Sequence, residues 1–222
     1  MQSGPLLEAV FDCWAAKELP YLDSIIRAYA TTIDAPCSRG EGGWPTRPAS
    51  PPVTELAELQ RQTPSTAFTP EGRVLALLAR ASTGLTWFHN TSERWAQAPG
   101  NDGRTDTSCV LVGNALGAPH RRDQFLLGFM YVSPHNTYPL HAHAATEAYH
   151  VIAGEAWLQK NDSGLVRKSA GDVNVHRPYD THALVTKESP VLVCWVNSGD
   201  VGGEYYFVDE GEGGTPTLRS ML

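Results

Sequence analysis

The second half of this chain is a succession of short runs of β-forming residues, and no other feature of the sequence constrains the fold as much. The runs begin at about Thr107 and are separated by turn-forming residues such as Gly154, Gly171 and Pro178. They cover residues 109–112, 125–132, 148–152, 156–159, 172–175, 183–186, 191–196 and 205–208. Many short strands at close spacing, with no long helical pattern between them, are typical of an antiparallel barrel or sandwich. We therefore predict a mainly β fold for this half.

The N-terminal third has a different pattern, in which apolar residues recur at the three- and four-residue spacing of amphipathic helices. Two such series are Leu6, Leu7, Val10, Phe11 and Trp14 and, after Pro20, Leu22, Ile25, Ile26 and Tyr29. A third helix is expected after Pro70, since proline suits the first turn. The proline- and glycine-rich stretch 34–52 suits neither a helix nor a strand and is predicted to be a loop or linker. We divide the chain into a helical extension, 1–105, and a β-barrel domain, 106–222.

Length, charge and apolar runs disfavour several classes of protein. The 222 residues fit one domain, or one domain with an extra segment. The net charge of -7 argues against sequence-independent contact with nucleic-acid phosphates. No apolar stretch approaches the roughly 20 residues of a membrane span, and the N-terminal residues lack the pattern of a secretory signal. We expect a cytoplasmic protein with neither nucleic acid nor membrane as a partner.

The cysteines give no sign of a metal or redox motif. They are Cys13, Cys37, Cys109 and Cys194, which lie far apart in the sequence. None belongs to a C-x-x-C pair of the kind found in zinc sites and thiol oxidoreductases. We expect buried or idle thiols in a reducing compartment.

The most informative segment runs from Tyr138 to Gly154 and concentrates titratable side chains on one strand face. In an extended chain alternate residues share a face, so His141 and His143 point together, and Glu147 and Tyr149 join them if the chain stays extended. Burying two imidazoles and a carboxylate is unfavourable unless something compensates, and a divalent cation commonly does. Solvated or hydrogen-bonded side chains are the alternative interpretation, but H-x-H followed by an acidic residue is far more specific than a lone histidine.

These residues resemble the two motifs of the cupin family. The first reads His141-x-His143-x3-Glu147-x6-Gly154, and the second begins at Gly171 and ends at His182. Two departures stand out: His135 replaces an expected glycine, and residues 178–182 lack the usual glycine of the second motif. The resemblance implies a double-stranded β-helix, or jelly-roll barrel, that holds one divalent cation with four side chains.

Within the cupins, the segment is similar to the cupin-type dimethylsulfoniopropionate lyases. Their string Tyr-Pro-x-His-x-His-x3-Glu-x-Tyr is matched by Tyr138, His141, His143, Glu147 and Tyr149. The resemblance implies a metal-dependent carbon-sulfur lyase that forms dimethyl sulfide and acrylate. It also implies metal ligands at His141, His143, Glu147 and His182, with Tyr149 as the catalytic base.

The chemistry that the resemblance implies is physically reasonable. A cation that binds the substrate carboxylate stabilises charge developing at the neighbouring carbon, and it also favours the ionised form of a nearby phenol. Tyr138 is the rival base; it lies three residues before His141, which puts it outside the inward parity, so we expect it to position substrate. Weaker candidates for aromatic contact with the sulfonium are Trp157, Trp195 and Tyr206, with Tyr205 also possible.

Several alternatives remain open at this point. The same ligand set in a cupin dioxygenase would hold Fe(II), and a non-catalytic cupin would bind a small molecule without turning it over. The metal could be iron, manganese, zinc, cobalt or nickel, and the protein could be a homodimer. We expect the N-terminal third to cover a mouth of the barrel or to form a subunit contact without contributing a ligand. His135, His150 and His176 are interpreted as lying on the surface or behind the ligands.

Overall fold

The computed structural model describes residues 3–31, 46–63, 68–90, 106–113, 117–122, 124–210 and 216–220. Its helices are α1 (Ser3–Ala15), α2 (Pro20–Thr31), α3 (Val53–Gln62), α4 (Pro70–Ala81) and the short 3-10 helix η2 (Ser82–Gly84). The three helices that the sequence pattern predicts are confirmed, including the one that begins at Pro70. Helix α3 was not predicted, because it buries only Leu56 and Leu59 among polar neighbours.

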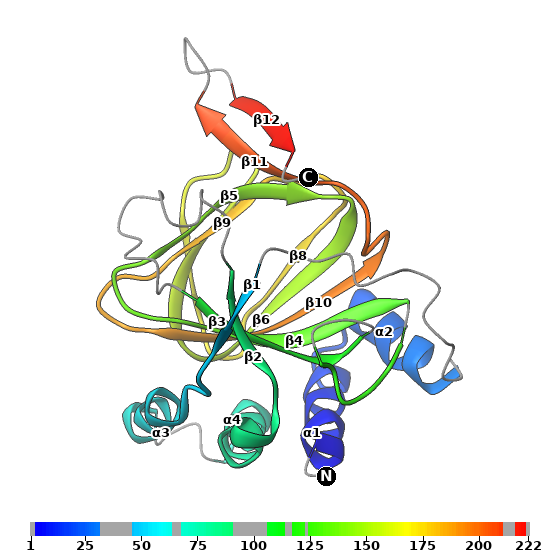
Figure 1. The fold of residues 1–222 in the computed structure, drawn as a ribbon, viewed down its shortest axis with the longest axis vertical. Helices are drawn as coiled ribbons and strands as arrows, with labels where there is room; N and C mark the ends of the chain where they lie inside the picture. Colours follow the sequence, from blue (N-terminus) through cyan, green and yellow to red (C-terminus); the bar gives the residue numbers. More distant parts are fainter. Residues whose placement is uncertain are drawn as a thin grey trace.

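The remaining elements are strands, which Figure 1 shows as one curved sheet. Those before the ligand motif are β1 (Thr46–Ala49), β2 (Trp87–Asn90), β3 (Asp106–Val112) and β4 (Phe125–Val132). Those that carry or follow it are β5 (Thr137–His143), β6 (Ala145–Lys160), β7 (Val166–Ser169), β8 (Val173–His176), β9 (His182–Val185), β10 (Val191–Gly199), β11 (Tyr205–Glu210) and β12 (Pro216–Ser220). The predicted mainly β fold with an N-terminal helical segment is confirmed.

Antiparallel pairing joins these strands in the order β1-β2-β3-β4-β10-β6-β9-β5-β11-β12, with β7 and β8 also paired to β6. Strand β6 organises the barrel, because its first half pairs with β10 and β8 and its second half with β7 and β9. The sequence pattern predicted two strands here, separated by a turn at Gly154. That prediction is wrong: Gly154 has a φ of 76°, and a Cβ at this position would lie 2.0 Å from the carbonyl oxygen of Pro190. Glycine therefore allows β6 to continue through the bend.

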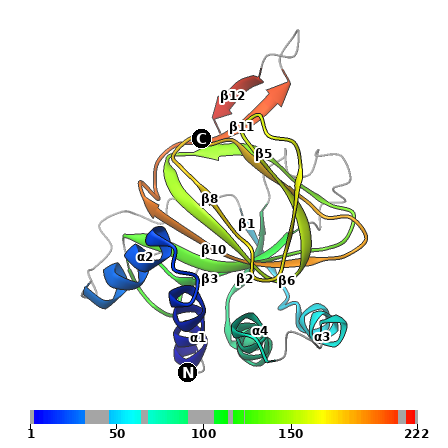
Figure 2. The same ribbon diagram turned by 180° about the vertical axis from the view of Figure 1, so that it is seen from behind.

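Alternation along the strands separates two cores. On β10, Leu192, Cys194 and Val196 face the cluster that includes the helices, whereas Val191 and Val193 face the cluster inside the barrel. Figures 1 and 2 show α1, α3 and α4 beneath the layer of β3, β4 and β10, and α2 beside the end of this layer. For the described helices, the expectation that the N-terminal third covers a mouth of the barrel is therefore wrong, and the alternative of a subunit contact stays a prediction. Its apolar helix faces pack against the outer face of the sheet, because that face is itself apolar.

The N-terminal segment also contributes strands to the sheet. Strand β1 pairs with β2, and β2 pairs with β3. Residues 46–49 belong to the stretch predicted to be a loop, and this part of the prediction is wrong: Pro48 lies in an edge strand, where a missing N–H is tolerated. Residues 34–45 of that stretch lie outside the described residues. The division at residue 105 stays a prediction, but the two parts share one sheet. No described helix is long and apolar enough to cross a membrane.

Candidate metal centre

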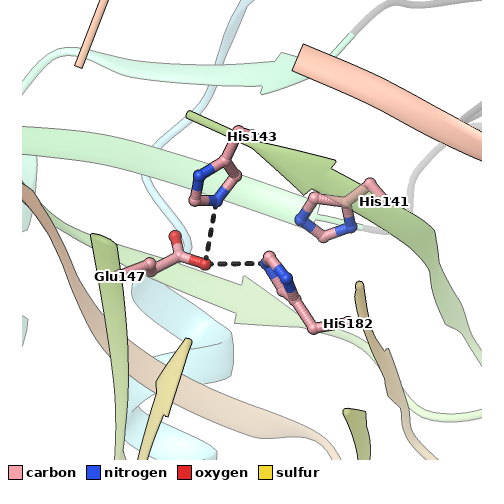
Figure 3. A group of neighbouring side chains, drawn as sticks. All are labelled: His141, His143, Glu147 and His182. Carbon is pink, nitrogen blue, oxygen red and sulfur yellow. Dashed lines mark hydrogen bonds and ion pairs between the residues drawn. The ribbon is translucent and has the colours of Figure 1, made fainter. Parts of the chain in front are cut away.

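Four side chains predicted as metal ligands converge inside the barrel. They are His141 and His143 on β5, Glu147 on β6 and His182 at the start of β9, and each offers a donor atom within 4.8 Å of the others. Figure 3 shows the three imidazoles and the carboxylate directed toward a common centre. All four residues are buried, with exposed fractions of 1 to 6%. The sequence motif thus becomes one compact group of nitrogen and oxygen donors.

Strand register explains this convergence. His141 and His143 are alternate residues of β5 and share its inner face, and His141 lies directly opposite His182 in the antiparallel pair of β5 and β9. The chain bends at Ala144 and enters β6, where Glu147 faces inward. The pairing of β5 with β9 and the bend between β5 and β6 therefore bring His182 close to the ligands of the first motif.

Backbone carbonyls orient the three imidazoles of the group. The Nδ1 atoms of His141, His143 and His182 lie 2.7, 3.0 and 2.8 Å from the carbonyl oxygens of Pro139, Ala145 and Asp180, respectively. A carbonyl can only accept a hydrogen bond, so each Nδ1 carries the proton and donates it. In the neutral ring this leaves the Nε2 lone pair for a ligand bond, and such outer contacts are usual around metal-binding histidines.

Glu147 lies at the centre of the polar contacts. Its Oε2 atom is 3.3 Å from Nε2 of His143 and 2.9 Å from Nε2 of His182. Burial raises the pKa of this carboxyl, but the charge and hydrogen bond of His143, with contacts from His176 and His182, outweigh burial and keep the pKa well below its usual range. Burial, together with the charges of His182 and His143, lowers the pKa of His141 well below its usual value. The group thus combines an ionised carboxylate with imidazoles, which suits a divalent transition metal.

One contact fits a cation in particular. Nε2 of His182 is buried and makes no hydrogen bond, although it lies 2.9 Å from Oε2 of Glu147. Because Nδ1 of His182 carries the ring proton, the neutral ring and the carboxylate turn two electron-pair donors toward each other. A cation bound by both atoms would satisfy both. The residues present therefore fit a metal ion.

Tyr149 lies next to this group on the inner face of β6. It is 3% exposed, and its ring meets those of His176 and His182 edge-on, at 5.2 and 5.8 Å between centroids. Burial, and then the negative charge of Glu147, raises the pKa of the phenol well above its usual value. A phenol in this setting is neutral unless a positive charge offsets that of the carboxylate.

Tyr138 also faces the interior, which corrects the prediction that it lies outside the inward parity. Its ring is 7% exposed and meets the His141 ring edge-on, at 5.2 Å between centroids. The register changes between Tyr138 and His141, because three steps along β5 correspond to two along β9, from Leu184 to His182. This irregularity is a β-bulge, and it turns both side chains to the same face.

Tyr205 on β11 is a third buried tyrosine at the centre, although the sequence pattern placed it only among the weaker aromatic candidates. Its ring stacks on His141, with centroids 5.1 Å apart and planes inclined by 9°, and burial raises the pKa of its phenol well above the usual value. Tyr206, the predicted substrate contact on this strand, lies on the opposite face, where its hydroxyl meets Glu204. The tyrosine of β11 that reaches the centre is therefore Tyr205. Strand alternation places Tyr205 and Tyr206 on opposite faces of β11. The sequence does not say which of these faces is turned to the interior, so it could not identify Tyr205 as the inward residue.

The two tryptophans differ in the same way. Trp195 packs against the interior cluster, opposite Tyr149 in the register of β10 and β6. Trp157 lies on the other face of β6 from Ala156 and Leu158, which belong to the interior, and the Lys187 ammonium covers its ring at 4.1 Å. Trp195 therefore lies beside the centre, and Trp157 lies on the outer face.

Three further histidines have distinct places. His135 is on the surface, with its side chain 66% exposed near Glu188, as predicted. His176 is buried behind Glu147, also as predicted, and burial together with the charge of His182 lowers its pKa to about 4. His150 is a correction: it is 1% exposed and faces away from the centre, because it has the opposite strand parity. Its imidazole contacts the N-terminal helices.

His150 belongs to a second buried polar group, between β6 and helices α1 and α4. Donor atoms of Cys13, Glu71 and His150 lie within 4.8 Å of one another, a spacing that could hold a metal. The Lys17 ammonium lies 2.5 Å from the Glu71 carboxylate, and the Trp14 indole donates to Nδ1 of His150 at 3.2 Å. The lysine already supplies the positive charge that this carboxylate needs, so the group is complete without an ion.

The cysteines agree with the prediction where the structure describes them. Cys13, Cys109 and Cys194 are buried free thiols, and all three belong to the core between helices and sheet. Burial, assisted by the charge of Glu71, raises the pKa of Cys13 to about 12. These thiols are therefore protonated and unreactive. Cys37 lies outside the described residues.

Comparisons with known proteins agree with this geometry. Residues 48–193 match the family model described as dimethylsulfoniopropionate lyase. A protein of Cereibacter sphaeroides named as the dimethylsulfoniopropionate lyase DddL is 28% identical over 123 residues, which cover 55% of this chain and 49% of that protein. The matched region thus spans about half the length of this curated relative.

Two solved structures share the fold over nearly the whole chain. The dimethylsulfoniopropionate (DMSP) lyase DddQ from Ruegeria pomeroyi DSS-3 superposes with a TM-score of 0.68 and 20% identity, covering 92% of this chain and 94% of the other. A chain from the crystal structures of the DMSP lyases RdDddP and RnDddQII gives a TM-score of 0.66 and 20% identity, covering 94% and 98%. The N-terminal helices are therefore included in the shared fold.

Proposed function

This chain belongs to the dimethylsulfoniopropionate lyase family, and we propose that it cleaves dimethylsulfoniopropionate to dimethyl sulfide and acrylate at a metal centre. The proposed ligands are His141, His143, Glu147 and His182. The observation that supports this most is the convergence of these four donors within 4.8 Å beside a buried tyrosine. The oriented Nδ1 atoms of the three imidazoles add to it.

A divalent cation at this centre would supply Lewis acidity, binding the substrate carboxylate and stabilising negative charge that develops next to it. Iron, manganese, zinc, cobalt and nickel all accept three imidazoles and one carboxylate. The barrel wall excludes water from the donors, since all four are buried. Electrostatic contacts are stronger in such an environment than in bulk water.

We assign the proton transfer to Tyr149. Its phenolate oxygen accepts the proton from the carbon next to the substrate carboxylate, and that C–H electron pair becomes the new C=C bond. The bond from the neighbouring carbon to the sulfonium breaks, and dimethyl sulfide leaves with its electron pair. The Tyr149 hydroxyl then returns its proton to solvent, which completes a balanced β-elimination.

Other aromatic side chains would orient the substrate. Tyr138 and Tyr205 flank His141, the first edge-on and the second stacked, so their hydroxyls can hold the carboxylate end. Trp195 packs beside Tyr149 and offers a π face to the positively charged sulfonium. Tyr138 is the rival for the base, because its ring also faces the interior.

The decisive experiment incubates the full-length protein, loaded in turn with each of the five metals, with dimethylsulfoniopropionate. Dimethyl sulfide and acrylate should appear in equal amounts, with or without oxygen. Oxygen consumption without dimethyl sulfide would instead identify a dioxygenase, which the same donor set could serve with Fe(II). Saturable binding without turnover under any metal would indicate a non-catalytic binding protein and refute the lyase proposal.

We also propose a cytoplasmic location and a homodimer. The free, buried thiols of Cys13, Cys109 and Cys194 suit a reducing compartment. Cell fractionation tests the location, and sedimentation of the full-length protein tests the dimer. Recovery in the periplasm, or a monomer at all concentrations, would contradict the respective part.

A further inference from the structure

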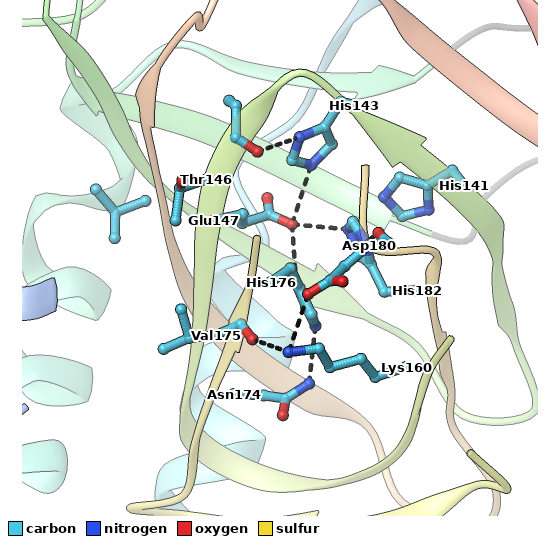
Figure 4. A network of polar contacts seen from close by, with 12 residues as sticks. His141, His143, Thr146, Glu147, Lys160, Asn174, Val175, His176, Asp180 and His182 are labelled. Atoms are coloured by element: carbon cyan, nitrogen blue, oxygen red, sulfur yellow. Dashed lines mark hydrogen bonds and ion pairs between the residues drawn. The ribbon is translucent and has the colours of Figure 1, made fainter. Parts of the chain in front are cut away.

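A fourth buried histidine lies at the centre, and the proposed reaction gives it no task. His176 on β8 is 1% exposed, and its ring stacks on that of His182, with centroids 3.9 Å apart and planes inclined by 12°. The same ring meets Tyr149 edge-on at 5.2 Å. Figure 4 shows it beneath Glu147, between that carboxylate and Asn174. A polar ring so placed needs a reason to be buried.

Asn174 determines which nitrogen of His176 carries the proton. Its Nδ2 atom lies 2.8 Å from Nε2 of His176. An amide nitrogen can only donate, so Nε2 of the ring accepts and Nδ1 bears the hydrogen. Nδ1 is in turn 3.5 Å from Oε2 of Glu147, which lies opposite His176 in the register of β6 and β8. Nδ1 is thus within ion-pair distance of the carboxylate, although it makes no hydrogen bond to it.

We propose that His176 is a positioning residue for the metal centre: its Nδ1–H attracts the carboxylate of Glu147 electrostatically across 3.5 Å, while its ring face packs against the imidazole of His182. This inference rests on the metal centre proposed above. Two of the four donors would then be oriented before a cation arrives. With Asn174 on Nε2 and a proton on Nδ1, His176 has no lone pair for the cation, so it acts from behind the ligands and is not a fifth one.

The expected effect is a change in metal affinity. Residues that orient metal ligands commonly contribute about 10- to 100-fold to affinity. His176→Phe keeps a flat ring but removes the N–H, so it should weaken binding by about that factor. His176→Asn retains an N–H near the position of Nδ1 and should recover part of the affinity. Asn174→Leu removes the group that sets the tautomer and should weaken binding in the same direction.

A matched control is His150→Gln. His150 is also 1% exposed and lies on β6, but it faces the helices and does not contact the candidate ligands. This variant should lower the melting temperature of the metal-free protein and leave metal affinity within a few-fold of wild type. It separates loss of orientation from general loss of stability.

The experiment measures Co(II) and Zn(II) affinity of the full-length protein by competition with a chromophoric chelator, together with the Co(II) absorption spectrum. The inference predicts weakened binding and an altered spectrum in His176→Phe, partial recovery in His176→Asn, and wild-type values in His150→Gln. Wild-type affinity and spectrum in His176→Phe would overturn the inference and leave the metal centre standing. If His176→Phe fails to fold, Asn174→Leu decides: unchanged affinity and spectrum there would overturn it. Absence of binding by the wild-type protein would instead refute the metal centre itself.

Discussion

At the scale of single residues, the electrostatic interaction between Tyr149 and Glu147 connects the candidate base to the candidate metal ligands. Burial and the carboxylate raise the pKa of this phenol, so its ionisation depends on a neighbouring positive charge. The metal and the base are therefore expected to act as a unit, and their contributions should not be additive.

Tyr149→Phe should abolish elimination while the metal remains bound. Phenylalanine keeps the ring but removes the proton acceptor, and loss of a general base typically lowers turnover by about 10²- to 10⁴-fold. Steady-state kinetics with parallel elemental analysis provide the measurement. Tyr138→Phe is the matched control and should retain measurable kcat with a raised KM. If the two variants behaved in the opposite way, the roles of the two tyrosines would have to be exchanged.

His182→Ala should lose metal and activity together, because the four donors are expected to share one cation. A ligand that binds only the folded state adds about 2.7 kcal/mol at a concentration 100-fold above its Kd. Chelation should therefore lower the Tm of the metal-loaded wild type and change that of His182→Ala little. His135→Ala, on the surface, should respond to the chelator like the wild type. Full metal occupancy and activity in His182→Ala would remove this residue from the centre.

At the scale of elements, strand β6 connects the centre to the helices, since its two faces carry different polar groups. Glu147 and Tyr149 face the interior, and His150 faces α1 and α4, where it meets Trp14 and Glu71. Lys17 on the turn after α1 extends this contact to the carbonyl of Gly171, at 2.9 Å. The helical segment thus contacts, from the outer side of the barrel, the glycine that begins the second cupin-like motif, Gly171.

The buried Glu71 predicts a pH dependence of stability. The hydrogen bond from His150, with those from Lys17, outweighs burial and holds the pKa of this carboxyl well below its ordinary 4.5. A depressed pKa in the folded state contributes stability above the unfolded value and loses it as pH falls below about 4.5. Urea unfolding should show Glu71→Gln less stable than wild type at pH 7, with the difference shrinking toward pH 3. A difference independent of pH would contradict this account, and Glu58→Gln, on the exposed side of α3, is the control.

At the scale of the whole molecule, the helices form one layer and the barrel another, joined by the larger apolar core. This core joins side chains of α1, α2, α3 and α4 to the outward residues of β3, β4, β6 and β10. All four candidate ligands come from the barrel layer. We therefore expect the helical layer to contribute to the free energy of unfolding. It can affect the geometry of the metal centre only indirectly, through the strands against which it packs.

A chain beginning at Pro70 should keep every candidate ligand and yet fold poorly. It loses Leu6, Val10, Trp14 and Leu22, each no more than 1% exposed, and uncovers the apolar face of the sheet. We expect a lower Tm, binding of a hydrophobic dye and aggregation, compared with full-length protein under the same conditions. A soluble, cooperatively folded truncation with unchanged metal affinity would show that the helical layer is dispensable.

Local patterns in the sequence were enough to predict the helices with clear apolar stripes, most strands and the shared face of His141, His143 and Glu147. Those predictions depend on spacing of three to four residues along a helix or two along a strand, which the chain carries within a few residues. His182, far along the chain, was predicted only through the resemblance to the cupin motifs. Helix α3 and strand β1 were not predicted, because the apolar stripe of α3 is short and β1 contains a proline. Only contact with the rest of the molecule stabilises these two elements.

Which side chains join the centre from a distance was decided by the tertiary structure alone. The bulge after Tyr138 turns that tyrosine inward, and the pairing of β11 with β5 selects Tyr205 over Tyr206. The pairing of β8 with β6 brings His176 behind Glu147. The physical reason is that strand register and facing depend on pairing between segments far apart in the chain, and a one-residue bulge reverses every facing beyond it.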